Sequence, residues 1–591
     1  MRGFALALLA VLAAASASAS PPAAEPSGRL PLILLEVEAG PLRPSLVEHH
    51  RARIQIFERQ PHGTQTSNAL GWEGRAEFHL RGNSSQGHPK KPYKLELQDE
   101  QGRERKAALL GMPAGSDWIL LPAYTDKTLV RDALAYELWR AMGHYAPRTR
   151  YVELFIQGQP GSAWDKDQEH SDDGVRGKGY AYRTVPLTDE QGDWRLFSSS
   201  EQDPPRPAAA ADAPAKSELA DVPEAVESDM RGYQGVYLLI EKVTRGKNRL
   251  NLRKLHPDPL EPSGFAGGYI FKKDRVNVDE HGFTSSVGID FVYEEPKERE
   301  IQPEQKEWLI RHVRSIEHAL FGPSFRDPDL GYPALMDVDS FIDYHWMVEA
   351  TKNIDGYWFS QYYHFDQGGK LKIGPIWDWD LSFGNAFYYG GHQTNGWRWE
   401  TLRGPHYRWF ARLFEDPDFL QRYIDRWSEL RSSVLATSNV LARVDALVAQ
   451  IGEAQVRNYQ RWRTLGAYVH PNRFIGQSYE EEVAWMKQWI TGRLAWIDSQ
   501  GFPAPKVELA EGRPAGPVKL TLSAETGRVY YTLNGTDPRL RGGVRNPVGV
   551  EVTNPLLVSR PFVLTARVLS EHGLWSAPVR VGGVERDAGG Q

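Results

Sequence analysis

The segment KLKIGPIWDWDLSFG, at residues 370–384, contains the residues best suited to chemistry, Asp378 and Asp380. On an extended strand these two carboxylates point to the same side, and the flanking tryptophans point to the other. Two neighbouring carboxylates between tryptophans need a cation, and oxygen ligands suit Mg²⁺, Mn²⁺ or Ca²⁺. The segment therefore predicts a divalent metal site. A solvated strand end with its tryptophans buried is the alternative.

A further acid, Asp355, precedes this segment in the sequence Asn-Ile-Asp-Gly. Residues 357–365 and 371–376 are expected to form a hairpin, which would return Asp378 to the neighbourhood of Asp355. One carboxylate would then accept a proton while the other holds a metal, as phosphoryl transfer requires. A glycosidase also uses two carboxylates, so a hydrolase stays open on these residues alone.

A small, basic segment nearer the N-terminus could bind phosphate. Arg81 begins the sequence RGNSS, and Lys91 follows shortly after it, between two expected strands. Small residues leave backbone N–H groups accessible, and basic side chains add positive charge. Glu241 lies inside the apolar strand expected at residues 236–243, where a carboxylate needs a cationic partner. A surface ion pair is the alternative for Lys91 and for Glu241.

Alternating apolar residues indicate the strands that would position these groups. Residues 76–80 and 93–97 each place every second side chain in a core. Residues 151–156 and 236–243 read as two further strands. The segment 160–232 between them is rich in proline, alanine and charged residues, which indicates an insertion at a hairpin tip. The two flanking strands are therefore expected to pair.

Helical periodicity dominates from Pro303 onward. The clearest helix begins at Ser478, which forms a capping box with Glu481, and ends before Gly501. The expected helices are 126–143, 305–321, 339–351, 405–434, 439–465 and 478–500. Strands followed by helices predict an α+β fold.

The character of the chain changes again after Pro505. Residues 507–522 alternate, and a β-rich run meets the turn signal Asn534-Gly535. These features predict a small all-β sandwich over residues 503–591.

The N-terminus and the composition indicate export. Arg2, the apolar run 4–15 and the small residues 17–19 have the pattern of a cleaved signal peptide over residues 1–19. A Pro/Ala linker follows at 20–29. The chain has no cysteine, which excludes disulfides and is compatible with export. Its formal net charge of -6 gives no support for a nucleic-acid partner. No segment is long and apolar enough to predict a membrane span.

Several motifs in order resemble the CotH family of atypical, kinase-like proteins, over roughly residues 32–502. They are RGNSS at 81–85, KKPYKLEL at 90–97, LVRDALAYELWRAMG at 129–143, GVYLLIEKV at 235–243, NID at 353–355 and IWDWDLSFG at 376–384. Each motif alone is weak, but the ordered set is specific. The resemblance implies a distant protein-kinase-like fold, with a β-rich N-terminal lobe and a helical C-terminal lobe spanning residues 30–502.

The resemblance also implies an ATP- and metal-dependent protein kinase. Asp355 would be the catalytic aspartate, Asp378 would bind Mg²⁺ or Mn²⁺ (Ca²⁺ being a third option), and Asp380 would assist it. Residues expected on the nucleotide are Lys91, oriented by Glu241, together with Arg81, Arg131 and Trp377.

The chain departs from ordinary kinases at two points. Ser360 stands five residues after Asp355, where ordinary kinases have an asparagine as a second metal ligand. A GxGxxG loop is also missing from the sequence. Residues 529–543, VYYTLNGTDPRLRGG, resemble the small β-sandwich that follows chitobiase and β-hexosaminidase catalytic domains, and imply a cell-wall or glycan contact.

Three functions fit the sequence. The first is a secreted, periplasmic or cell-surface kinase that phosphorylates Ser or Thr of an exported protein. The second is a non-catalytic surface adhesin on the same fold. The third is a carbohydrate-active hydrolase.

Overall fold

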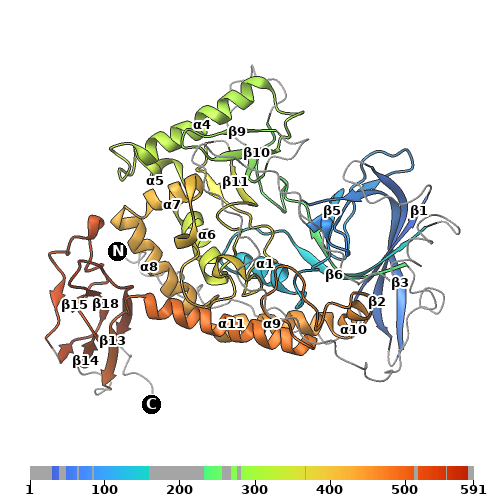
Figure 1. The fold of residues 1–591 in the computed structure, drawn as a ribbon. Helices are drawn as coiled ribbons and strands as arrows, with labels where there is room; N and C mark the ends of the chain where they lie inside the picture. The colour runs from blue at the N-terminus through green and yellow to red at the C-terminus, as the bar shows by residue number, and fades with distance from the viewer. Residues whose placement is uncertain are drawn as a thin grey trace, which may run out of the picture.

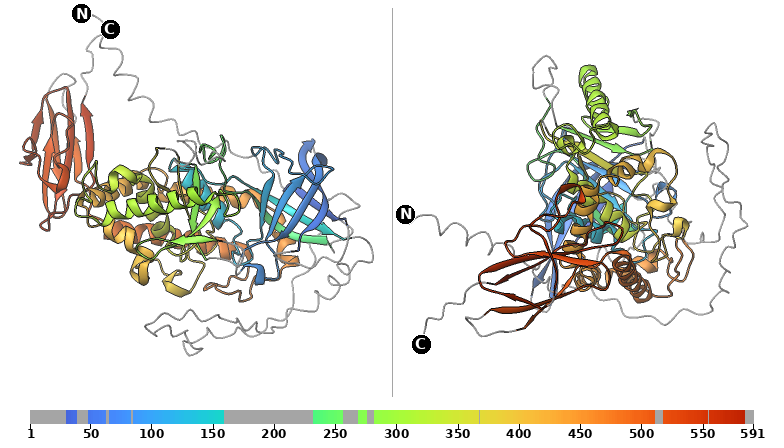
Figure 2. Two further views of the ribbon diagram at one scale, coloured as in Figure 1. Left: turned by 90° about the horizontal axis from the view of Figure 1, so that it is seen from above. Right: turned by 90° about the vertical axis from the view of Figure 1, so that its left-hand side faces the viewer.

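The computed structural model describes residues 30–38, 48–62, 65–82, 85–158, 232–255, 268–275, 281–366, 368–510, 517–553 and 555–583, the side chains of 59–69 excepted. The expected signal peptide, the linker, residues 160–231 and the pair Asn83 and Ser84 lie outside the described residues. Three regions follow one another along the molecule: a barrel, a central region rich in helices and a small all-β region (Figure 1). The barrel and the all-β region lie at opposite ends of the central region (Figure 2).

The first seven strands form a closed barrel in the order β1-β2-β3-β4-β5-β7-β6, with β1 and β6 running parallel. The strands are β1 (Leu32–Val37), β2 (His50–His62), β3 (Gln65–Leu80), β4 (Tyr93–Gln98), β5 (Asp117–Leu121), β6 (Thr149–Gln157) and β7 (Tyr233–Glu241). The alternation expected at 76–80 and 93–97 is confirmed: Phe78 pairs with Leu95, and both are buried. The β-rich part of the chain is thus a barrel, whereas a distant kinase-like lobe was expected.

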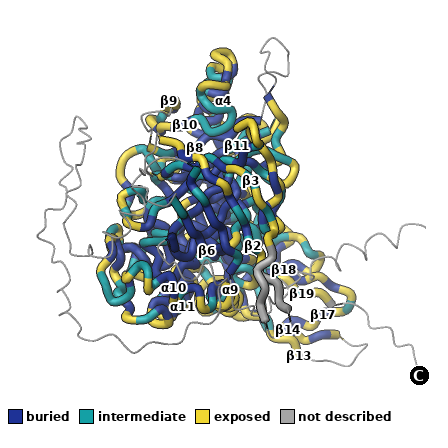
Figure 3. The backbone as a smooth tube through the Cα atoms, turned by 90° about the vertical axis from the view of Figure 1, so that its right-hand side faces the viewer, coloured by how far each residue is buried: buried dark blue, intermediate teal, exposed yellow. Residues whose placement is uncertain are grey.

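The strands on either side of the 160–232 segment pair as predicted. β6 and β7 are antiparallel neighbours, with Val152 opposite Tyr237. Both strands are almost fully buried, and the tube through β6 is dark blue in Figure 3. Glu153 on β6 forms a buried ion pair of 2.7 Å with Arg457, which joins the barrel to the central region.

The central region combines helices with a five-stranded sheet in the order β12-β11-β8-β10-β9. Its strands are β8 (Tyr269–Lys273), β9 (Gly282–Thr284), β10 (Asp290–Glu295), β11 (Gln361–Phe365) and β12 (Lys372–Ile373). Its helices are α1 (Arg131–Ala141), α4 (Pro303–Phe321), α5 (Tyr332–Leu335), α6 (Val338–Thr351), α7 (Arg408–Leu413), α8 (Pro417–Arg431), α9 (Thr437–Ile451), α10 (Ala454–Arg461) and α11 (Tyr479–Gln500). The result is the expected α+β class.

Two long helices that the sequence predicts are each divided in the structure. The helix expected at 405–434 breaks before Pro417, which lacks an N–H, and Asp416 caps the new helix by accepting from Asp418 N. The helix expected at 439–465 breaks at Gly452, whose φ of 49° is accessible to glycine. The capped helix α11 agrees with its prediction, since Ser478 accepts from Glu481 N.

The all-β region consists of two sheets, β13-β14-β17 and β16-β15-β18-β19, around a shared apolar core. Its strands are β13 (Lys506–Ala510), β14 (Val518–Ser523), β15 (Arg528–Thr532), β16 (Val550–Glu551), β17 (Leu556–Val558), β18 (Phe562–Leu569) and β19 (Val579–Gly583). Arg567 on β18 joins it to α8 through an ion pair of 2.6 Å with Asp425. None of the described helices has the length and apolarity that crossing a membrane requires.

Candidate functional site

The loops after α6 and β12 bring together the acids that the sequence singles out. α6 ends at Thr351, and Lys352 adopts a left-handed conformation that turns the chain into Asn353. Asn353 accepts from Asp355 N through Oδ1 at 2.9 Å and donates from Nδ2 to the Asp378 carbonyl at 3.1 Å. One side chain therefore holds the Asp355 turn against the Asp378 segment. The proximity that the hairpin argument predicted is confirmed.

Asp378 and Asp380 do not lie on a strand, so the prediction that strand alternation points their carboxylates to the same side is wrong. β12 ends at Ile373, and Asp378 lies in an irregular segment with a φ of 65°. The Tyr136 hydroxyl on α1 accepts from Asp378 N at 3.4 Å, and the neighbouring Trp379 N donates to Asp132 at 2.7 Å. The segment is thus held by α1 instead of by a sheet.

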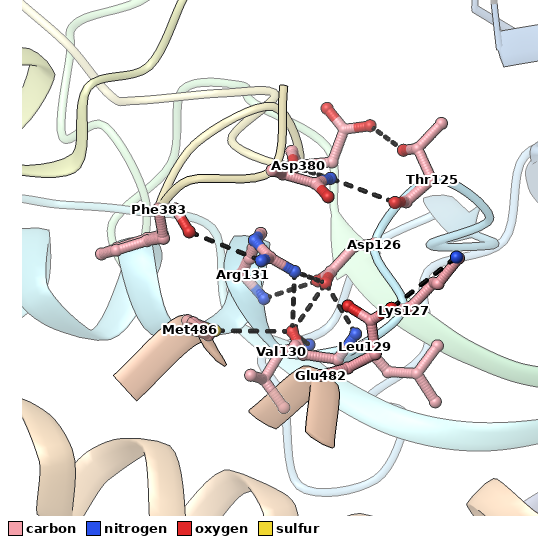
Figure 4. A network of polar contacts seen from close by, with 12 residues as sticks. Thr125, Asp126, Lys127, Leu129, Val130, Arg131, Asp380, Phe383, Glu482 and Met486 are labelled. Atoms are coloured by element: carbon pink, nitrogen blue, oxygen red, sulfur yellow. Dashed lines mark hydrogen bonds and ion pairs between the residues drawn. The ribbon is translucent and has the colours of Figure 1, made fainter. Parts of the chain in front are cut away.

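Asp380 is held by a network from several loops. The Thr125 hydroxyl donates to its carboxylate at 2.6 Å, and Asn385 Nδ2 donates to its carbonyl at 2.8 Å. Asn472 donates to the Thr125 carbonyl at 2.8 Å. Figure 4 shows Thr125 pointing toward Asp380 beside the contacts of Asp126 and Arg131. Because one oxygen of Asp380 is engaged by Thr125, its orientation is fixed.

The acids of this site raise one another's pKa. Desolvation by the surrounding protein and the charge of Asp380 raise the pKa of Asp378 to about 7, although Asp378 is exposed to solvent. Burial and the charge of Asp378 raise the pKa of Asp355 to about 6. Burial raises the pKa of Asp380 to about 6 as well, against the lowering effect of the Thr125 hydrogen bond. Mutual repulsion of this kind marks a site that is short of positive charge.

Two acids of the site were missed by the sequence reasoning. Burial, followed by the charges of Asp380 and Asp378, raises the pKa of Asp132 well above its usual range. Asp274 follows β8 and contributes to the raised pKa values of Asp355 and Asp378. The signal for Asp132 was present, because it begins a helix within one of the ordered motifs. Nothing in the spacing of Asp274 indicates that β8 ends here.

The predicted phosphate-binding arginines differ in how free they are. Arg81 is partly exposed, its guanidinium lies 5.2 Å from the centre of the buried Trp377 ring, and its charge lowers the pKa of Asp378. Arg131 is fully buried, pairs with Asp126, and donates to the Ser382 carbonyl at 3.1 Å. Arg131 therefore anchors the loop that carries Asp380, and Arg81 is the better placed of the two for a ligand.

The predicted pairing of Lys91 with Glu241 is wrong. Glu241 is fully buried and forms ion pairs with Arg148 at 3.1 Å and Arg249 at 3.0 Å. Lys91 donates to the Gln86 carbonyl at 2.8 Å. Glu241 lies at the end of β7, where arginines from two adjacent loops reach it, so its charge is balanced without a lysine.

Backbone strain is concentrated around the acids. Among the residues that the structure describes, eight other than glycine have positive φ angles, and five of these fall between residues 352 and 389. They include Asp378 and Ser360, whose hydroxyl donates to Asp378 Oδ2 at 3.4 Å. Strained backbone of this kind persists where the surrounding structure holds it and is typical of functional sites.

The carboxylate oxygens of the site suit an ion that is shared with a phosphate ligand better than an ion held by protein groups alone. Within the described part of the chain, no three His, Asp or Glu side chains are grouped so as to hold an ion unaided. Ca²⁺ takes six to eight oxygens, whereas Mg²⁺ is usually held by one or two carboxylates together with substrate phosphates. Asp378 and Asp380 with their raised pKa values therefore fit Mg²⁺ or Mn²⁺ on a phosphate ligand, and fit an all-protein Ca²⁺ site poorly.

The chain matches the model of a known protein family. The family model described as CotH kinase protein matches residues 78–170 and 226–497, which include every acid of this site. No curated protein matches the chain at a significant level.

Proposed function

The chain belongs to the CotH kinase protein family, and from this premise we propose that it is an exported, metal-dependent protein kinase that transfers phosphate from ATP to Ser or Thr of an exported protein. The observation that carries the proposal is the joining of Asp355 and Asp378 by Asn353. Asn353 joins main-chain atoms of the two residues, and among the described residues neither carboxylate forms an ion pair, although nearby arginines lower the pKa of each. Phosphoryl transfer needs this combination of a proton acceptor and an anionic metal site.

Asp355 would accept the proton of the attacking hydroxyl. Its pKa of about 6 lies close to neutral pH, where a general base is both ionised and basic enough to act. Asn353 fixes the Asp355 backbone, and the Tyr344 hydroxyl donates to the next carbonyl, of Gly356, at 2.7 Å. A base held in this way does not need to reorganise when the substrate arrives.

Asp378 and Asp380 would hold a divalent ion, and Arg81 would contact phosphate beside it. When bound, the ion neutralises phosphate charge and ATP supplies the phosphoryl group. The exposed edge of Asp378 leaves that carboxylate accessible to a ligand, whereas Asp380 keeps its orientation through Thr125. In the transfer, the Ser or Thr oxygen bonds to the γ-phosphorus, its proton passes to Asp355, and the bond from the γ-phosphorus to the leaving oxygen of ADP breaks.

The test is label transfer from radiolabelled ATP with Mn²⁺, to the protein itself or to dephosphorylated casein. Asp355→Ala and Asp378→Ala are each expected to lower transfer by at least about 10²–10³-fold. Asp445→Ala is the matched control, because Asp445 pairs with Lys487 on the exposed surface of the helical region. Transfer that survives Asp378→Ala would rule out the proposed role of this carboxylate.

A non-catalytic binding protein is the second candidate, and one observation favours it. Glu241 is neutralised by two arginines, so it does not orient a lysine on the nucleotide phosphates as the resemblance implies. Calorimetry with ATP and Mn²⁺ separates the candidates. Binding without label transfer under any metal would favour the binding protein, and binding followed by transfer would favour the kinase.

Export and a glycan contact are further parts of the proposal. Export rests on the signal-peptide pattern of residues 1–19, and N-terminal sequencing of protein recovered outside the cytoplasm would give residue 20 as the first residue. The glycan contact rests on the resemblance of residues 529–543 to a chitobiase-type sandwich. A pull-down on insoluble peptidoglycan and chitin tests it.

A further inference from the structure

The turn that carries Asp355 also carries two aromatic residues, Trp358 and Phe359. The backbone N–H groups of both donate to the Asp355 carbonyl, at 2.7 and 2.9 Å. The centre of the Trp358 ring lies 5.2 Å from that of Tyr389, and the guanidinium of Arg275 lies 4.5 Å from the centre of the Phe359 ring. Tyr389 and Arg275 are therefore both supported by residues that are fixed to Asp355.

Tyr389 ends a run of three aromatic residues, 387–389, which remains open to solvent beside Asp355. Their ring centres lie 5.6 and 5.4 Å apart in chain order, and Phe387 and Tyr389 are 40% and 37% exposed. The fully buried Arg398 lies 4.8 Å from the centre of the Tyr389 ring, so the exposed part of the ring faces away from the core. Burial and then the charge of Asp355 raise the pKa of Tyr388, which places the run next to that acid.

The backbone of Tyr389 is strained. Its φ of 50° lies in the left-handed region, which a bulky side chain rarely adopts. Such strain persists only where the surrounding structure holds it, and it is typical of ligand-binding segments. A strained tyrosine whose ring is left partly exposed is not explained by packing of the core, and it presents aromatic surface to a ligand.

Arg275 adds positive charge on the same side of the site. It is exposed, and its guanidinium forms no ion pair with a residue that the structure describes. The neighbouring Asp274 pairs instead with Lys272, at 3.6 Å. Against burial, which raises the pKa of Asp355, the charge of Arg275 lowers it, so Arg275 lies close to that acid. An exposed guanidinium in this position suits a carboxylate of a ligand.

The surroundings of Asp355 thus differ from those of Asp378. Arg81 lies near Asp378 and against the buried ring of Trp377, where the phosphates of the donor are expected. Exposed aromatic rings and Arg275 lie near Asp355, where the hydroxyl of the acceptor is expected. Aromatic surface and a carboxylate-binding cation together match a segment of protein chain better than a nucleotide.

We propose that Phe387, Tyr389 and Arg275 form the acceptor-binding surface, and that it selects a Ser or Thr with an aromatic and an acidic residue within a few positions of it. The inference rests on the proposed role of Asp355. This protein itself contains a sequence of that chemistry, LFSSSEQD at 196–203, outside the described residues. That sequence supplies the probe.

The experiment is fluorescence anisotropy of a labelled LFSSSEQD peptide with the full chain, in Mg²⁺ buffer without nucleotide, so that no transfer takes place. Two altered peptides test the two parts of the surface: Phe197→Ala removes the aromatic side chain, and Glu201→Gln with Asp203→Asn removes the charge. Each is expected to bind at least about fivefold more weakly than the native peptide. These arms use the unaltered protein, so they do not depend on the folding of a variant.

Protein variants identify the contacts. Tyr389→Ala and Arg275→Glu are each expected to weaken binding of the native peptide at least about fivefold. Arg311→Glu is the matched control and should leave binding unchanged, because Arg311 lies on the exposed surface of α4 and pairs there with Glu307. Tyr389→Phe keeps the ring and should bind nearly as tightly as the native protein.

Crossing the two sets tests the contacts directly, because residues that touch do not have additive effects. Arg275→Glu should bind the peptide with Glu201→Lys and Asp203→Lys more tightly than the native peptide. Tyr389→Ala should no longer distinguish the Phe197→Ala peptide from the native one. Equal weakening of every peptide by both variants would overturn the assignment of these residues.

The acceptor surface and the kinase activity can fail separately. The surface is overturned if the native peptide does not bind at millimolar concentration, or if neither altered peptide binds more weakly. Label transfer to casein combined with either result would leave the kinase proposal standing. Selective peptide binding without label transfer to any acceptor would support the surface and count against the kinase proposal.

Discussion

Two groups of aspartates in this protein differ in how their charge is balanced. Asp425 and Asp537 share the buried guanidinium of Arg567, at 2.6 and 2.7 Å, where the all-β region meets α8. Asp378 and Asp380 share no cation, and in the described part of the chain neither forms an ion pair, although Arg81 lies near.

The first group raises the pKa of its arginine, while burial and then mutual repulsion raise the pKa values of the acids in the second group. Paired carboxylates hold parts of a fold together, whereas carboxylates left without a partner are held for a ligand.

The largest difference between the two groups of aspartates should appear in the phosphate-transfer activity of their variants. Asp378→Ala is expected to lower label transfer by at least about 10²–10³-fold, the size of effect seen when one electrostatic stabiliser is removed. The same change removes repulsion with Asp380, so thermal unfolding should move to a higher temperature in metal-free buffer. Scanning calorimetry with EDTA measures this. A lower unfolding temperature for Asp378→Ala would mean that the acids of the site stabilise the fold.

A substitution of Arg567 should have the opposite effect, a loss of stability with little change in activity. Arg567→Ala leaves Asp425 and Asp537 without their shared cation, and should lower the free energy of unfolding by about 2–4 kcal/mol. Urea denaturation measures the loss, and label transfer per folded molecule should stay near the native value. Arg528→Ala is the control, since Arg528 is an exposed arginine of the same region whose ion pair with Glu551 is 3.7 Å long.

The two groups should also respond differently to pH. The pKa values of Asp355 and Asp378 are about 6 and about 7 in the folded protein, above the roughly 3.9 of an unfolded aspartate. Between pH 4 and 7 these two acids therefore bind more protons in the folded state than in the unfolded state, and their contribution to stability falls as pH rises through this window.

Asp378→Asn should remove the Asp378 part of this contribution, so the slope of stability against pH should become more positive than in the native protein. Saturating Mn²⁺ should act in the same direction, because the ion favours the ionised acids. Arg567→Ala should leave the slope unchanged. Denaturation curves at pH 4.5, 5.5, 6.5 and 7.5 measure it. An equal slope in the native protein and in Asp378→Asn, in metal-free buffer, would contradict the charge imbalance at the site.

The smallest expected effect is a gain at Ser360. This residue has a φ of 56°, a conformation that asparagine tolerates better than most residues, and it contacts Asp378 at 3.4 Å. Ser360→Asn supplies the amide that ordinary kinases use for a second ion, and should tighten Mn²⁺ binding about threefold to tenfold, or ~1 kcal/mol. Calorimetry with Mn²⁺ measures it. Ser360→Ala is the control and should weaken binding slightly.

Local patterns predicted much of the fold. The pairing of β6 with β7 followed from apolar alternation on both sides of a segment that forms a poor core, and α11 followed from its capping residues. Closure of the barrel did not follow. It depends on the parallel pairing of β1 with β6, and no local pattern specifies the partner of a strand that is distant in sequence.

The site shows a similar division. The residue types of Asp355, Asp378 and Asp380 were sufficient to predict that these acids form one site. The expected strand through Asp378 and Asp380 was wrong, because β12 ends five residues before Asp378. Glu241 was expected to pair with Lys91, whereas its partners Arg148 and Arg249 come from loops whose positions depend on the tertiary fold. The type of a residue thus predicts which chemistry its side chain can perform, whereas the tertiary packing determines which charged side chain it pairs with.

The pairing of β6 with β7 also constrains how the protein is made on the ribosome. Residues 158–232 must be synthesised after β6 before β7 exists, a delay of roughly 4–15 s at about 5–20 residues per second. Arg457, the partner of Glu153 on β6, emerges later still. Until β7 has emerged, the nascent barrel exposes the unpaired edges of β5 and β6. We therefore expect cells to need a chaperone that holds the first 157 residues.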